Sequence, residues 1–167
     1  MIVCNSTVLI FLSKIDKLYL LKELFKTVLI PEEVKREVVD QGKKKNCLDA
    51  IEIENSINDG WIKVDSVEIQ PLLNNVGIDD GEAGAISLAY KKKVGILLDQ
   101  THAREAARLL KLRPKGTIYV LLLALKKKMI DYDTYLLSLL DLTEFGFRMS
   151  QEVYIEAVRM GKMINGK

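Results

Sequence analysis

Two polar residues directly follow apolar runs that are typical of buried strands. Asn5 follows residues 2–4, and Asp99 follows residues 94–98, a continuous apolar run that predicts a central parallel strand. In an open parallel sheet, ligands bind in the crevice at the carboxyl ends of the strands. We therefore expect Asn5 and Asp99 to lie at one crevice.

Two glutamates on predicted helices are further candidates for this crevice. Glu82 lies in the first turn of the helix before the 94–98 strand, and Glu37 lies near the buried side of the helix that follows Pro31. Converging carboxylates repel one another unless a cation joins them. Because the donors are oxygens, without a cluster of histidine or cysteine, they favour Mg²⁺ or Mn²⁺ over zinc. Such ions clamp phosphate oxygens and activate water, so the pattern predicts a phosphodiester or phosphate substrate.

Each of these acids also has a purely structural interpretation. Glu37 is equally consistent with a solvated acid on a helix surface, and Glu82 with an acid that stabilises the positive end of its helix. Asp99 is equally consistent with a cap for the helix that follows it. The residue types and their spacing leave both interpretations open.

The elements that would position these residues alternate along the chain. The predicted strands are residues 2–4, 28–30, 61–64 and 94–98. The predicted helices are residues 9–24 with a break near 13–16, 32–41, 48–57, 79–89, 100–110, 117–128, 133–142 and 151–160, and residues 65–78 form a loop. This alternation predicts one α/β domain over residues 1–167, with three layers, a mainly parallel sheet, and the helices from about residue 131 packed on the same domain.

Composition excludes several classes of protein. The chain has 167 residues, of which 49% are hydrophobic, so it can bury a core and is not a disordered chain. The formal net charge is +2, so any binding to nucleic acid must depend on a local basic patch. Cys4 and Cys47 form neither a disulfide framework nor a metal-binding pair, which favours a reducing cytoplasm.

Membrane insertion and export are not expected. The longest uncharged apolar run, residues 118–125, is shorter than the roughly 20 residues needed to cross a bilayer. Residues 1–12 are apolar but lack a basic segment and are interrupted by Asn5, Ser6 and Thr7, so they do not read as a signal peptide.

Four segments in series resemble the acidic motifs of PIN-domain nucleases. Residues 2–10 resemble the opening strand, where the family has an acid followed two residues later by serine or threonine. Residues 30–38, 81–89 and 97–106 resemble the segments that carry the other acids, and residues 115–118 and 144–150 extend the resemblance. The later segments resemble a small prokaryotic branch related to the VapC-type toxin ribonucleases of toxin–antitoxin pairs.

The resemblance implies a three-layer α/β/α fold and metal-dependent hydrolysis of RNA. It implies that Glu37, Glu82 and Asp99 are ligands of Mg²⁺ or Mn²⁺ or support those ligands. Thr7 would place a hydroxyl beside the first ligand position, and Thr117 would line the same pocket. The implied partners are RNA, a possible antitoxin protein and a second copy of the chain in a homodimer.

Two positions depart from the family pattern. The first acid is replaced by Asn5, and the position after Asp99, often an aspartate in this branch, is Gln100. Because affinity for hard cations follows ligand charge, these amides should weaken metal binding. Two alternatives to the ribonuclease therefore stay open: a catalytically impaired PIN-like domain that binds RNA or a protein partner, and an α/β domain with an acidic Mg²⁺ site for a small phosphorylated ligand.

The basic residues allow two interpretations as well. Lysine triplets at residues 43–45, 91–93 and 126–128 either stabilise helix ends or contact an RNA backbone. Lys35, Arg36 and Arg104 lie nearer the expected crevice and are the candidate RNA-binding residues. His102, the single histidine, is expected on the surface rather than as a general base.

Overall fold

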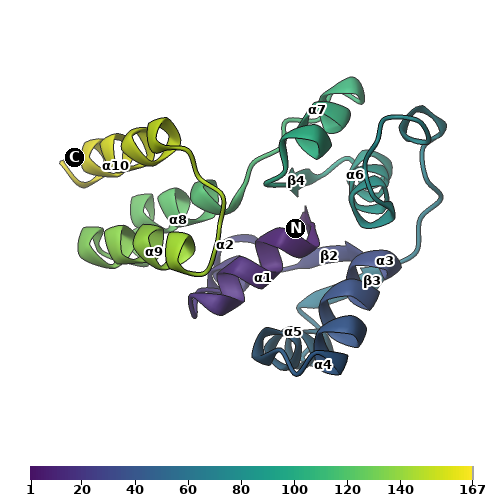
Figure 1. Ribbon diagram of the computed structural model, residues 1–167, viewed down its shortest axis with the longest axis horizontal. Coiled ribbons are helices and arrows are strands. Elements are labelled where there is room, and N and C mark those ends of the chain that lie inside the picture. Colours follow the sequence, from purple (N-terminus) through teal and green to yellow (C-terminus); the bar gives the residue numbers. More distant parts are fainter. Residues whose placement is uncertain (167) are drawn as a thin grey trace.

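A parallel sheet forms the centre of the computed structural model, which describes residues 1–166 (Figure 1). Its strands are β1 (Ile2–Cys4), β2 (Val28–Pro31), β3 (Ile62–Asp65) and β4 (Gly95–Leu97), in the order β3-β2-β1-β4. Val3 lies between Leu29 of β2 and Ile96 of β4. All three pairings are parallel, as the alternation of strands and helices predicts.

Alternate side chains of the strands enter different cores, which gives the molecule three layers. Ile2 and Cys4 pack into one core with the helices of the amino-terminal and carboxyl-terminal parts of the chain, whereas Val3 packs into the other with α6 and α7. This period of two is the expected geometry of an extended strand buried on both faces. The predicted three-layer α/β/α class is confirmed.

The helices have the following bounds. They are α1 (Ser6–Lys14), α2 (Tyr19–Phe25), α3 (Glu32–Lys35), the π-helical segment η1 (Arg36–Gln41), α4 (Gly42–Lys44), α5 (Leu48–Asn58), the 3₁₀ turn η2 (Pro71–Leu73), α6 (Asp80–Lys92), α7 (Thr101–Leu109), α8 (Thr117–Lys126), α9 (Tyr132–Glu144) and α10 (Gln151–Asn165). The break between α1 and α2 falls at the predicted position, where Asp16 has a positive φ of 55°.

Two details differ from the expectation. The helix after Pro31 does not end before Gly42, because η1 and α4 continue it through a π-helical turn with Gly42 in helical conformation. The strand ending at Leu97 is not central, because β4 lies at one edge of the four-stranded sheet. The backbone of Lys115 pairs with the outer side of β4. Its N–H donates to Ile96 O at 3.0 Å, and its carbonyl accepts from Leu98 N at 2.7 Å. The side chains of this edge strand are apolar because Ile96 and Leu97 are buried in the two cores on its opposite faces.

The carboxyl-terminal helices are joined to the rest of the chain through α8. α8 contacts α1 and α2 on one side and α9 and α10 on the other (Figure 1). Buried Tyr135 of α9 donates to the carbonyl of Ala157 in α10 at 2.8 Å, and Phe147 stacks edge-on against Phe11 of α1 with ring centroids 5.1 Å apart. Among residues 1–166 no helix is both long enough and apolar enough to cross a bilayer.

Candidate functional site

The carboxyl edge of the sheet brings together the ends of β1 and β4 and the start of α1 and α7. Asn5 follows β1 and is 1% exposed, and its backbone N–H donates to Leu97 O of β4 at 3.1 Å. Gln100 precedes α7. The parallel pairing of β1 with β4 therefore places the two residues side by side.

Asn5 and Gln100 are joined by their side chains. Asn5 Nδ2 donates to Gln100 Oε1 at 3.2 Å, and the Thr7 hydroxyl donates to the same oxygen at 3.3 Å. The Ser6 hydroxyl donates to Asn5 Oδ1 at 3.3 Å. The expectation that Thr7 lies beside the first ligand position is consistent with these contacts, and the residue facing Asn5 is Gln100 rather than Asp99.

The Asp99 carboxylate points toward α8. Its Oδ1 accepts from the backbone N–H of Thr117 at 2.8 Å and its Oδ2 accepts from the Thr117 hydroxyl at 2.7 Å. Burial raises the pKa of Asp99, and the two bonds from Thr117 oppose this rise. Asp99 thus caps α8, across 18 residues of chain, rather than the helix that follows it.

Gly116 allows this close approach. A Cβ added at Gly116 would overlap Asp99 Oδ1 and come within 3.2 Å of Arg104 Nη1. Arg104 Nη1 also donates to the carbonyl of Leu98 at 3.0 Å. The Gly116 backbone is extended, so its lack of a side chain serves space rather than conformation.

Glu82 lies in the first turn of α6 and forms a capping box with Asp79. Its backbone N–H donates to Asp79 Oδ1 at 2.7 Å, and its Oε2 accepts from the Asp79 N–H at 3.2 Å. Burial of the side chain, which is 6% exposed, is the main reason that its pKa is raised, and the charges of Asp79 and Glu37 add to the effect. The structural interpretation of Glu82 therefore has direct support.

Glu37 lies in η1, exposed, with its carboxylate near the start of α6. Its Oε2 would be 3.5 Å from a Cβ at Gly81. Glu37, Asp79 and Asp80 line a cleft of about 330 Å³ between η1 and α6. Glu37 Oε2 thus lies beside the residue that precedes Glu82, and the charge of Glu37 contributes to the raised pKa of Glu82.

The donors fit a divalent cation in type but not in arrangement. Within residues 1–166, no three side chains of histidine, cysteine, aspartate or glutamate converge closely enough to hold a metal ion. Both Asp99 oxygens bind Thr117, Glu82 Oε2 binds the Asp79 amide, and the pair at the strand ends is neutral. A hard cation needs several charged oxygens at one point, so the residues as arranged do not form a resident Mg²⁺ or Mn²⁺ site.

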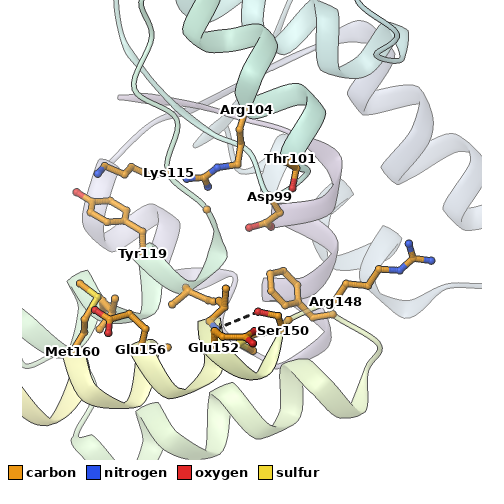
Figure 2. Close-up of a pocket in the computed structure, with 17 residues that line it drawn as sticks. Asp99, Thr101, Arg104, Lys115, Tyr119, Arg148, Ser150, Glu152, Glu156 and Met160 are labelled. Carbon is orange, nitrogen blue, oxygen red and sulfur yellow. Dashed lines mark hydrogen bonds between the residues drawn. The ribbon is translucent and has the colours of Figure 1, made fainter.

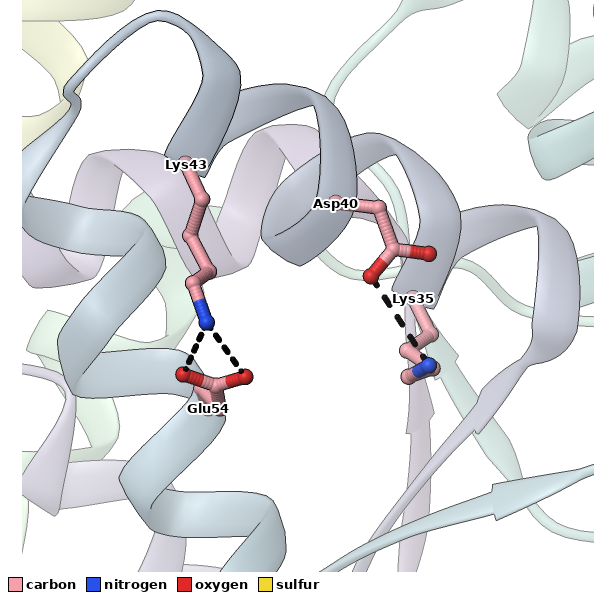
Figure 3. A network of polar contacts seen from close by, with 4 residues as sticks. All are labelled: Lys35, Asp40, Lys43 and Glu54. Atoms are coloured by element: carbon pink, nitrogen blue, oxygen red, sulfur yellow. Dashed lines mark hydrogen bonds and ion pairs between the residues drawn. The ribbon is translucent and has the colours of Figure 1, made fainter.

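The candidate RNA-binding residues have partners of their own. Lys35 pairs with Asp40 at 3.8 Å (Figure 3). Arg36 pairs with Glu33, also at 3.8 Å, and both pairs lie near the surface. The same figure shows Lys43 contacting both carboxylate oxygens of Glu54 at 2.9 and 2.8 Å. Exposed pairs of this kind are weak in water, so a phosphate can displace the acid. His102 is exposed, as expected, with 86% of its side chain accessible.

A cavity beside Asp99 contains residues that the sequence did not single out. It has a volume of about 740 Å³ and lies between the start of α7 and helices α8 and α10 (Figure 2). Arg104 lines it together with Lys115, Tyr119 and Arg148. Lys115 bridges to β4 before α8 begins, so no helical spacing in the sequence signals its proximity to Tyr119.

Comparison with known proteins agrees with the α/β fold. The sequence matches the family DUF3368, described as a PIN domain, over residues 1–162. Searches of curated proteins and of solved structures gave no significant match. Since the match covers nearly the whole chain, the chain belongs to the PIN-domain family.

Proposed function

We propose that this PIN domain binds single-stranded RNA through the carboxyl edge of its sheet and that its hydrolytic activity is greatly reduced. PIN domains have a nuclease-type fold and generally use divalent metal ions. The observation that carries the proposal is the hydrogen bond of 3.2 Å between Asn5 Nδ2 and Gln100 Oε1, where the family pattern has acids.

The charge of this edge supports binding without a metal. A cage of acids repels phosphate unless a cation is present, whereas two amides add no negative charge. Asn5 and Gln100 are also the N-cap residues of α1 and α7, and within residues 1–166 neither side chain accepts a hydrogen bond from a backbone N–H of its own helix. The amide groups that begin both helices, each at the positive end of a dipole, can therefore face a phosphate.

Residues around Asn5 and Gln100 would contact the phosphate backbone of a longer RNA strand. The Thr7 hydroxyl donates to the Gln100 side chain, and the Arg104 guanidinium donates to the Leu98 carbonyl. Lys35 and Arg36 can exchange their carboxylate partners for RNA phosphates. Binding should therefore weaken as salt rises, because phosphate contacts release condensed counterions.

Fluorescence anisotropy with a labelled single-stranded RNA tests the proposal. We expect equal affinity in EDTA and in Mg²⁺ for the natural chain. The double variant Asn5→Asp/Gln100→Asp should bind more weakly in EDTA and recover with Mn²⁺. The control Asn74→Asp/Asn75→Asp adds the same charge in the exposed loop before α6 and should not change binding. An affinity that disappears in EDTA for the natural chain would contradict the proposal.

A second candidate is a metal-dependent ribonuclease, including the toxin of a toxin–antitoxin pair. The position of Glu37 favours it, because its carboxylate lies beside Gly81, the residue before Glu82, at the cleft between η1 and α6. Under this alternative, cleavage of RNA with Mn²⁺ would be lost in Glu82→Gln, a variant that retains the capping box. A cytoplasmic homodimer, with an antitoxin as partner, would fit the same alternative.

A further inference from the structure

The cavity between α7, α8 and α10 is separate from the edge formed by Asn5 and Gln100. Its volume of about 740 Å³ lies in the range of small-molecule sites, roughly 300–1,000 Å³. Asp99 and Thr101, on either side of Gln100 in the sequence, line this cavity, so it adjoins the strand-end site (Figure 2). We propose that this cavity binds one nucleotide of an RNA strand, with the base on Tyr119 and a phosphate near Lys115 and Arg104, an inference that rests on the proposed function.

Tyr119 supplies the stacking surface. Its half-buried ring lies on the wall formed by α8, and Lys115 Nζ is 5.3 Å from the ring centroid. Stacking of a base on an aromatic ring is stronger than a solvent-exposed contact between an ammonium and a ring. A base can therefore take the place of the ammonium, which is then available to a phosphate.

Arg104 supplies a second, better fixed cation on the same side. One bond from its Nη1 to Leu98 O, at 3.0 Å, holds the guanidinium in place, and a guanidinium has several further donors for an anion. Figure 2 shows Arg104, Lys115 and Tyr119 around one space above α10. These two cations define the side on which a phosphate would lie.

The opposite wall is acidic. Glu152 and Glu156 on α10 line the cavity from below, and Glu156 is also paired with Arg159 at 2.8 Å (Figure 2). Carboxylates repel phosphate but accept hydrogen bonds from amino groups. Asp99 also lines the α7 side, but both of its oxygens accept hydrogen bonds from Thr117 and the charge of Arg104 acts on it. The acids of α10 therefore favour a nucleotide with its phosphate toward the cations at α7 and its base edge toward α10, and with a base that carries an exocyclic amine.

The floor of the cavity is apolar, and the volume of the cavity favours a nucleotide over a peptide helix. Leu122, Val153 and Met160 provide apolar surface for the sugar and the base. Two turns of an α-helix form a cylinder about 11 Å long and 10–12 Å across, which requires about 1,000 Å³. The cavity is smaller than this, whereas it holds one nucleotide with room for ordered water.

Titration calorimetry of the full chain with 5′-AMP, 5′-UMP and inorganic phosphate tests the subsite. We expect 5′-AMP to bind more tightly than 5′-UMP, and phosphate alone to bind most weakly. Tyr119→Leu, which retains apolar volume without an aromatic face, should weaken 5′-AMP by at least about tenfold. Tyr119→Phe should bind as the natural chain does, and Lys115→Gln should weaken binding and reduce its salt dependence. Tyr19→Leu and Lys44→Gln, at exposed positions elsewhere, are the matched controls.

The outcomes separate the subsite from the proposed function. If 5′-AMP gives no heat at millimolar concentration, or if Tyr119→Leu binds it unchanged, the subsite is wrong, whatever the chain does with longer RNA. Conversely, 5′-AMP binding that is lost in Tyr119→Leu supports the subsite even where longer RNA fails to bind.

Discussion

The carboxylate of Asp99 holds the first residue of α8 by two hydrogen bonds, from the backbone N–H of Thr117 at 2.8 Å and from its hydroxyl at 2.7 Å. Thr117 is fully buried. A side chain at the end of β4 thus fixes the helix that carries the carboxyl-terminal helices. The same contacts occupy both carboxylate oxygens of Asp99.

Removing the Asp99 carboxylate should destabilise the chain. Asp99→Ala leaves the buried N–H and hydroxyl of Thr117 without their acceptor, which costs about 2–4 kcal/mol in the free energy of unfolding. Asp99→Asn retains one acceptor oxygen and should cost clearly less. Urea denaturation followed by circular dichroism measures both, and an Asp99→Ala chain as stable as the natural one would contradict this role.

Gly116→Ala should disturb the contact between Asp99 and Thr117. The added methyl group would overlap Asp99 Oδ1 and approach the Leu98 carbonyl at 3.3 Å, so the chain must shift at a cost of about 1–3 kcal/mol. Gly166→Ala, where the nearest atom would be 3.5 Å away, is the control. Thermal unfolding of the two variants should separate them, and equal melting temperatures would show that the Asp99 contact is not tight.

The buried Glu82 should make stability depend on pH. Its folded pKa is raised from the usual 4.5, so the folded chain binds this proton more tightly than the unfolded chain does. The stability gained from that proton is full below pH 4.5 and is lost as pH rises through the folded pKa. Glu82→Gln retains the oxygen that accepts from the Asp79 N–H and removes the charge. This variant should melt at a higher temperature than the natural chain at pH 7 and at an equal one below pH 4.5; the reverse order at pH 7 would contradict the argument.

The carboxyl-terminal helices should unfold together with the sheet. Tyr135→Phe removes the bond from the Tyr135 hydroxyl to the Ala157 carbonyl, at a cost of about 0.5–1.5 kcal/mol. Trp61, the single tryptophan, is buried beside β3 and reports on the distant side of the sheet. Its fluorescence and the circular dichroism of the helices should report the same unfolding midpoint in denaturant. Tyr135→Phe should shift the two midpoints by the same amount. Two separate transitions would instead indicate that residues 131–166 form an independent unit.

The elements with strong local signals could be predicted from the sequence. The apolar run Ile2 to Cys4, the helix start after Pro31 and the Asp79–Glu82 capping box each depend on neighbouring residues, and the structure has all three. The edge position of β4 was not predictable, because an apolar run records burial and not which strand pairs on its outer side. Lys115, distant in sequence, provides that cover.

The partner of Asn5 could not be identified from the sequence either. Adjacent residues at a strand end point in different directions, so the turn geometry decides whether Asp99 or Gln100 faces β1. The structure turns Gln100 toward Asn5 and Asp99 toward Thr117. The sequence indicated the two departures from the family pattern, but only the structure brings these two amides into contact.

Cleavage of single-stranded RNA in the presence of Mn²⁺ tests the central claim most directly. The natural chain, Asn5→Asp/Gln100→Asp and the control Asn74→Asp/Asn75→Asp should be compared at equal concentration. The claim that the amide pair accounts for reduced hydrolysis predicts little or no cleavage by the natural chain and the control, and Mn²⁺-dependent cleavage by the strand-end double variant. Efficient cleavage by the natural chain that is lost in Glu82→Gln would contradict it.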